Sequence, residues 1–97
     1  NKLISELEER DEVDDVSVRT QGKIIYITIT YLDSVSKDKA KEIANNTYTY
    51  YSEEVIKDYD FEYFLTQKKA DDAEEDTTFV IVGTKHADND YISWTKN

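Results

Sequence analysis

The sequence has no cysteine, no methionine and no proline, and only two glycines, among its 97 residues. Without cysteine, neither a disulfide framework nor a thiolate zinc site can form. The two glycines, Gly22 and Gly83, stand alone, which excludes a glycine-rich phosphate loop. No apolar run reaches the ~18 residues that a membrane-spanning helix needs. Disulfide-stapled scaffolds, nucleotide-binding loops and membrane spans are therefore not predicted.

Methionine is also missing at position 1, which leads us to expect a mature fragment whose start lies upstream of Asn1. The lack of cysteine is compatible with an extracytoplasmic location in the cell envelope, which we predict. A signal peptide or a lipid-attachment cysteine upstream would establish it. A cytoplasmic location stays open.

Acidic side chains outnumber basic ones by 22 to 12, which gives a net charge of −10. Such a surface repels nucleic-acid phosphates and anionic lipid headgroups, and no Lys/Arg cluster reverses the sign locally. We therefore predict no nucleic-acid partner and no membrane insertion. The length fits one domain, residues 1–97. Its hydrophobic share of 38% is low, but eight Tyr, three Phe and one Trp add large buried areas.

The first half of the chain predicts a helix followed by a hairpin. Residues 2–12 place Leu3, Ile4 and Leu7 on one helical side. Val16 and Val18 alternate with polar residues, Gln21-Gly22 offers a turn, and Lys23–Leu32 continues as a long strand. In that strand the Ile25, Ile27 and Ile29 face predicts the core, whereas Tyr26, Thr28 and Thr30 predict a partly solvated face.

The second half changes period. Ser36 can cap a helix that begins at Lys37, and a stripe of small and apolar side chains continues it for about five turns to Val55. Residues 45–51, "NNTYTYY", have poor helix propensity, so this part is a candidate for distortion. Three β-rich runs follow, "FEYFLTQKK", "TTFVIVGTK" and "YISWT", and the turn "HADND" separates the last two.

This order predicts an α+β two-layer sandwich, α-β-β-α-β-β(-β), with a mostly antiparallel sheet covered on one face by two helices. We expect the first strand to lie between the second and the third, which makes a split β-α-β arrangement. If the second and third strands are parallel, their connection should be right-handed.

Residues 3–66 resemble a known group of modules. "VDDVSV", then "GKIIYITITY", then a helix that begins Ser-x-x-x-Ala at Ser36 is similar to BON-like and ring-building α-β-β-α-β modules of bacterial envelope proteins. The chain also looks like small Gram-positive envelope lipoprotein domains of unknown function. It departs from the pattern by adding "TTFVIVGTK" and "YISWT" and by lacking a second glycine before the third strand. The resemblance implies a non-catalytic interaction role and assigns no functional residue.

Two acidic segments are candidates for calcium binding. The first segment, residues 71–76, contains five carboxylates but lacks the spacing and the central glycine of a calcium-binding loop. A solvated loop is therefore the simpler interpretation, and a docking surface for a basic partner is a second one. The second run, "HADND", is more simply a turn that bonds its own backbone. The candidate ligands are Asp71, Asp72, Glu74, Glu75, Asp76, Asp88 and Asp90. His86 is the only histidine, which argues against a zinc site and against Ser/His/Asp catalysis.

Tyrosines supply the remaining functional signal. They cluster around the second helix and the third strand, and Tyr is favoured at interfaces because it buries much area and keeps a polar tip. Core-edge packing is the alternative interpretation. The candidate contact residues are Tyr26, Thr28 and Thr30 on the Lys23–Leu32 strand, and Tyr48 and Tyr50 on the second helix.

From these observations we predict a non-enzymatic, extracytoplasmic protein-interaction module without a cofactor, which binds a protein partner or a second copy of itself. A calcium-dependent binding module is the alternative. A small enzyme with a carboxylate pair is the third possibility.

Overall fold

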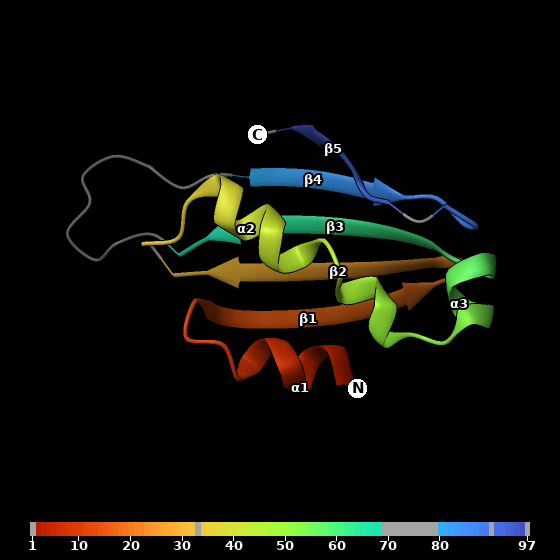
Figure 1. Cartoon of the computed structure of the whole chain (residues 1–97), viewed down its shortest axis with the longest axis horizontal. Helices are drawn as coiled ribbons and strands as arrows, with labels where there is room; N and C mark the ends of the chain where they lie inside the picture. Colours follow the sequence, from red (N-terminus) through yellow and green to blue (C-terminus); the bar gives the residue numbers. More distant parts are fainter. Residues whose placement is uncertain (1, 33, 69–79, 90, 97) are drawn as a thin grey trace.

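The computed structural model describes residues 2–32, 34–68, 80–89 and 91–96. In this part the chain forms a small α+β domain with a five-stranded mixed sheet (Figure 1). The elements are α1 (Lys2–Glu8), β1 (Val13–Gln21), β2 (Ile24–Tyr31), α2 (Lys37–Ala44), the 3₁₀ helix η1 (Thr47–Tyr50), α3 (Glu53–Asp58), β3 (Asp60–Gln67), β4 (Val80–Lys85) and β5 (Ser93–Lys96).

The strands lie in sequence order, β1-β2-β3-β4-β5, and only β2 and β3 are parallel. The expected insertion of the first strand between the other two is therefore wrong. β1 pairs with one edge of β2 through a two-residue hairpin, and β3 pairs with the other edge of β2. The β2–β3 connection passes in front of the sheet in Figure 1 and is right-handed, as expected for parallel strands.

The hairpin between β1 and β2 forms where Gly22 was expected to turn the chain. Gln21 pairs with Ile24, so Gly22 and Lys23 are the whole loop. Gly22 has φ +60°, and glycine at the first of two loop positions is typical of a type II′ turn, whose twist matches that of the strands.

Helix α1 ends at Glu8, four residues before the expected end. Leu3 and Leu7 are buried, as their spacing predicted. The residues that follow include Glu9, Asp11 and Glu12, and negative charge is unfavourable at a helix C-terminus. The acidic run therefore gives way to a turn before β1.

The single long helix expected from Lys37 to Val55 is wrong, because the segment is broken into α2, η1 and α3. Ser36 does cap α2, accepting from the Lys39 amide at 3.2 Å. The break follows Ala44, whose carbonyl accepts a 2.8 Å hydrogen bond from the Thr47 hydroxyl. Such a side-chain bond competes with the helical backbone bond. Ser52 then caps α3 by accepting from the Val55 amide.

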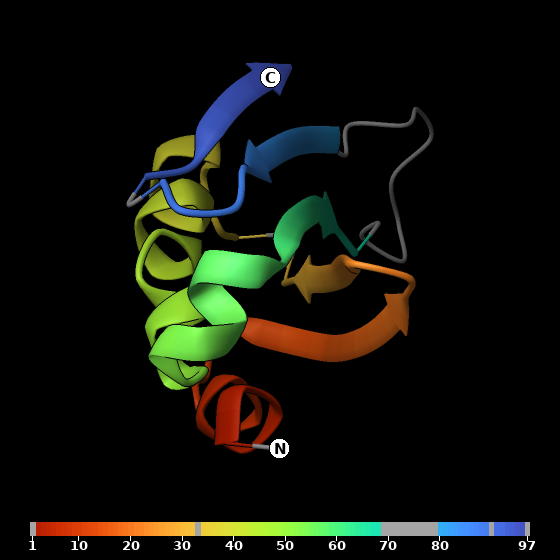
Figure 2. The same cartoon turned by 90° about the vertical axis from the view of Figure 1, so that its right-hand side faces the viewer.

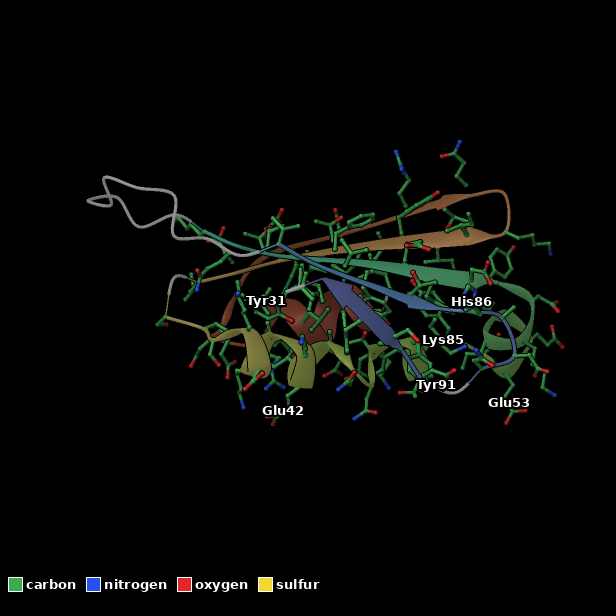
Figure 3. The ribbon with its side chains drawn as sticks, turned by 90° about the horizontal axis from the view of Figure 1, so that it is seen from above. Tyr31, Glu42, Glu53, Lys85, His86 and Tyr91 are labelled. Carbon is green, nitrogen blue, oxygen red and sulfur yellow. The ribbon has the colours of Figure 1, made fainter. Side chains whose placement is uncertain are left out.

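The core lies between the sheet and the helices. Figures 2 and 3 show the helices on one side of the sheet, with α1 along the edge formed by β1. The isoleucine face of β2 points into this core, as predicted, together with alternate residues of β3 and β4. Fully buried side chains include Ile27, Ile29, Tyr31, Phe61, Tyr63, Leu65 and Ile81.

Two buried tyrosines tie the sheet to the helices. The Tyr31 hydroxyl donates to the Ala40 carbonyl at 2.8 Å, and the Tyr63 hydroxyl lies 2.7 Å from the Thr47 hydroxyl (Figure 3 labels Tyr31). Burial raises the pKa of both phenols above the usual value of 10.0. Both side chains therefore remain neutral hydrogen-bonding groups over the physiological range.

Gly83 on β4 provides the space in which Trp94 packs. Trp94 on β5 lies edge-on to the Tyr63 ring at 6.0 Å, and its indole donates to Asn45 Oδ1. A Cβ atom at position 83 would overlap the Trp94 ring and approach Ile92 Cγ2 at 2.8 Å. The glycine is therefore required by packing, since its φ is not in the left-handed region.

Gly83→Ala should lower the free energy of unfolding by about 2 kcal/mol, the usual cost of forcing an extra carbon into a packed site. Equilibrium unfolding in urea measures this change. In a Trp94→Ala background the same alanine should cost far less, because the ring that it displaces is gone. An equal cost in both backgrounds would contradict this account of Gly83.

Candidate functional site

The face of the sheet that points away from the helices is the candidate functional site. In Figure 3 no helix of the described chain lies over it. Its members alternate with the core residues along β1 to β4, and all are partly or fully exposed. We call this surface the open face; it comprises Asp15, Ser17, Arg19, Gln21, Ile24, Tyr26, Thr28, Thr30, Asp60, Glu62, Phe64, Thr66, Val80, Val82 and Thr84.

Two aromatic rings form the centre of the open face. Tyr26 on β2 and Phe64 on β3 stack with ring centroids 6.4 Å apart and an interplanar angle of 18°. The guanidinium carbon of Arg19 lies 4.8 Å from the centroid of the Tyr26 ring, a cation–π distance. A planar, amphipathic platform of this kind offers a large contact area at low entropic cost.

Threonines and valines surround the two rings. The hydroxyls of Thr30 and Thr66 lie 3.3 Å apart across β2 and β3. The Thr84 hydroxyl lies 3.2 Å from each oxygen of the Glu62 carboxylate and donates to it. β-Branched side chains have few rotamers, so little side-chain entropy remains to be lost on binding. The open face is thus a stiff surface rather than a flexible one.

The predicted contact residues divide between two sides of the domain. Tyr26, Thr28 and Thr30 lie together on the open face. Tyr48 is in the core, only 8% exposed, and Tyr50 lies on the helical side, 41% exposed, with Lys2 Nζ 5.9 Å from its ring centroid. The structure therefore brings three of the five residues into one surface.

Sequence reasoning missed Phe64, Arg19 and Glu62. Phe64 alternates with the core residues of β3, so its outward direction was readable from the period of two. Its position opposite Thr28 and beside Tyr26 was not, because it depends on the register between parallel strands that are distant in sequence.

A fully buried lysine lies on the opposite, helical side of β4. Lys85 is 0% exposed; its Nζ lies 3.3 Å from the His86 carbonyl and 3.5 Å from the Ile56 carbonyl. It also lies 5.0 Å from the Tyr48 ring centroid and 5.5 Å from that of Phe61. Because Ile56 is in the last turn of α3, the ammonium group stabilises the negative end of that helix.

The candidate calcium ligands remain largely outside the described residues. This holds for Asp71, Asp72, Glu74, Glu75, Asp76 and Asp90. Asp88 is described: it is exposed, has φ +68°, and its amide donates to the Ile56 carbonyl at 3.3 Å. Within the described ranges, no three His or acidic side chains come together as a metal-binding group.

Side chains of the described residues line open hollows at two places on the helical side. One, of about 440 Å³, is lined by Glu53, Ile56, Lys57, Asp88 and Asn89. The other, of about 390 Å³, is lined by Asn45, Asn46, Tyr48, Tyr91 and Ile92. The two carboxylates of the first hollow, those of Glu53 and Asp88, are exposed. His86 does not line either hollow.

Comparison of the chain with family models, curated proteins and solved structures finds no match. The resemblance to envelope modules therefore stays a prediction. None of the described helices is both long enough and apolar enough to cross a bilayer.

Proposed function

We propose that this domain is a non-enzymatic protein-interaction module whose binding surface is the open face. One observation carries the proposal: a stiff aromatic and β-branched sheet surface that the described helices leave uncovered. In this proposal the domain is a two-layer sandwich in which the helices stabilise the sheet from one side and the opposite side binds. Aromatic enrichment with few charges is typical of the centre of a protein interface.

Charge distribution supports the same surface. The chain carries a net charge of −10, and on the open face the strand register places one cation, Arg19, and three anions, Asp15, Asp60 and Glu62. Most of the acidic side chains lie elsewhere, and together with these three they disfavour nucleic acid and other acidic partners. The row of Ser17, Thr28, Phe64 and Val82 at the centre of the open face is uncharged, so it can be desolvated without leaving unpaired charges, which is the main cost of burying a polar surface.

The extracytoplasmic, cell-envelope location belongs to this proposal as well. Its support is the absence of cysteine, which removes any requirement for a reducing compartment. Fractionation of cells that express the full-length gene product would test it. Recovery in the cytoplasmic fraction would contradict the location but not the interaction.

Site-specific photo-crosslinking tests the interaction. A photoreactive amino acid at Thr28, on the open face, should give covalent protein adducts in the native cell. The same amino acid at Glu42, an exposed residue on the outer side of α2 (Figure 3), is the matched control and should give few. Equal yields at the two positions would contradict an open-face binding site.

A further inference from the structure

The second hollow on the helical side joins two segments that are distant in the chain. We call it the asparagine hollow. Its described lining comes from the end of α2, from η1 and from the residues just before β5: Asn45, Asn46, Tyr48, Tyr91 and Ile92. The Trp94 indole donates to Asn45 Oδ1 at 3.1 Å and so connects the two segments. At about 390 Å³ the hollow falls within the range of ligand-binding pockets, roughly 300–1,000 Å³.

The Trp94 hydrogen bond fixes the direction of the Asn45 amide. An indole N–H can only donate, so it faces the amide oxygen and not the amide nitrogen. The Nδ2 group of Asn45 therefore keeps its N–H donors for another partner. Asn46 precedes η1 as its N-cap residue, yet its side chain makes no capping hydrogen bond among the described residues. Two amide groups are thus available to a ligand in the hollow.

An exposed aromatic ring lies beside these amides, on the helical side of the sheet (Figure 3 labels Tyr91). Tyr91 is 58% exposed, more than any other large hydrophobic side chain in the described part of the chain. Tyr48 and Ile92 also line the hollow and are buried, so they supply apolar surface beneath it. A ligand that covers the Tyr91 ring removes apolar area from water, which favours binding.

The lining selects a class of ligand. None of the described residues that line the hollow is charged, so an ion would be desolvated there without a counter-charge. A purely apolar ligand would leave the Asn45 and Asn46 amides unpaired. The hollow therefore suits a neutral molecule with several hydrogen-bonding groups around an apolar face. A pyranose sugar has this constitution, because its hydroxyls donate and accept and its C–H groups form a patch that the negative face of an aromatic ring attracts.

We propose that the asparagine hollow binds one ring of a neutral saccharide, with Asn45 and Asn46 bonded to its hydroxyls and its C–H face against Tyr91. This site is separate from the open face, and the proposal does not depend on the interaction function above. An open hollow contacts only part of its ligand. A sugar of about 12 heavy atoms, bound with the efficiency usual for larger ligands, gives a dissociation constant of about 1–3 mM.

NMR titration of the purified chain tests the site, with glucose, galactose and N-acetylglucosamine as probes. Trp94 is the only tryptophan, so its indole N–H gives a single signal, and this group is bonded to Asn45. At least one of the three sugars should shift that signal saturably, with a dissociation constant in the millimolar range. Glycerol, which has hydroxyls but no ring face, should cause no saturable shift.

Two substitutions examine the two kinds of contact. Tyr91→Ala removes the ring and should weaken sugar binding about tenfold, whereas Tyr91→Phe keeps the ring and should stay within about threefold. Asn46→Ala removes one amide and should weaken binding about three- to tenfold. The matched controls are Tyr50→Ala, at another exposed tyrosine, and Asn89→Ala, in the first hollow. Both should leave the affinity unchanged, and circular dichroism confirms that each variant is folded.

The same ring chemistry occurs in a free sugar and in one unit of a polysaccharide. The trisaccharides maltotriose and tri-N-acetylchitotriose distinguish these two sources. A dissociation constant at least about tenfold below that of the corresponding monosaccharide assigns the polysaccharide, and an equal value assigns the free sugar.

Two results would overturn the saccharide proposal. One is the absence of a saturable shift of the Trp94 indole signal with every one of these sugars up to about 100 mM. The other is a shift whose concentration dependence Tyr91→Ala leaves unchanged. The absence of crosslinking at Thr28 would contradict the open-face proposal alone, so the two proposals fail separately.

Discussion

Lys85→Glu is expected to lower the free energy of unfolding by about 4 kcal/mol or more, which is most of the stability of many small domains. Lys85 is fully buried and directs its ammonium group toward the carbonyls of Ile56 and His86 and toward two aromatic rings. A carboxylate there would face carbonyl oxygens and the negative faces of the rings. The variant should be largely unfolded, or far more sensitive to urea, by circular dichroism.

Two variants separate the causes of this loss. Lys57→Glu makes the same charge change at an exposed position of α3 and should cost less than about 0.5 kcal/mol. Lys85→Met keeps the buried carbon chain and removes the charge with its hydrogen bonds, so its cost should be about 1–3 kcal/mol, less than that of Lys85→Glu, since the Ile56 carbonyl keeps the Asp88 amide as a donor. If Lys85→Glu were as stable as Lys57→Glu, the buried position of Lys85 would be wrong.

Alkaline pH should destabilise the domain by about 3 kcal/mol at pH 11 relative to neutral pH. Burial raises the pKa of Tyr31 and of Tyr63 above the usual 10.0, so the folded chain retains two protons that the unfolded chain releases. This contribution to stability is complete below pH 10. Above pH 10 it falls by about 1.4 kcal/mol per pH unit for each phenol, until the folded state itself titrates.

Two spectroscopic measurements check this result together. Ultraviolet absorbance of tyrosinate should show two of the eight tyrosines ionising only as the circular dichroism of the folded state is lost. Tyr63→Phe should reduce the loss per pH unit by about half, although it also removes the hydrogen bond to Thr47. Tyr91→Phe, at a side chain that is 58% exposed, should leave the slope unchanged. Complete ionisation of a folded chain would contradict the burial of both phenols.

Local patterns predicted much of the fold. The period of two in β2 and β3 identified the buried face of each strand, and Ser36 marked the start of α2, because these signals depend on neighbouring residues alone. The break after Ala44 was signalled only by poor propensity. Its position depends on Thr47, whose hydroxyl bonds both the Ala44 carbonyl and the Tyr63 hydroxyl of a distant strand.

The candidate site was predictable only in part, for the same reason. Tyr26, Thr28 and Thr30 were identified from β2 alone. Tyr48 was misplaced as a surface residue, since helical periodicity cannot show that η1 turns this ring toward Phe61, at 6.3 Å. The burial of Lys85 was also unpredictable, because a lysine at the end of an exposed-looking "VGTK" is normally solvated.

The sequence by itself determined the composition, the positions of turns, and which side of each strand is apolar. These properties arise from covalent geometry and from the alternation of side chains along an extended backbone. The tertiary structure alone decided that β2 and β3 are neighbours and that Phe64 stacks on Tyr26. It also decided that Arg19 and Glu62 share one row. Those relations come from pairing between segments that are distant in the chain, where the most favourable burial selects one register among many.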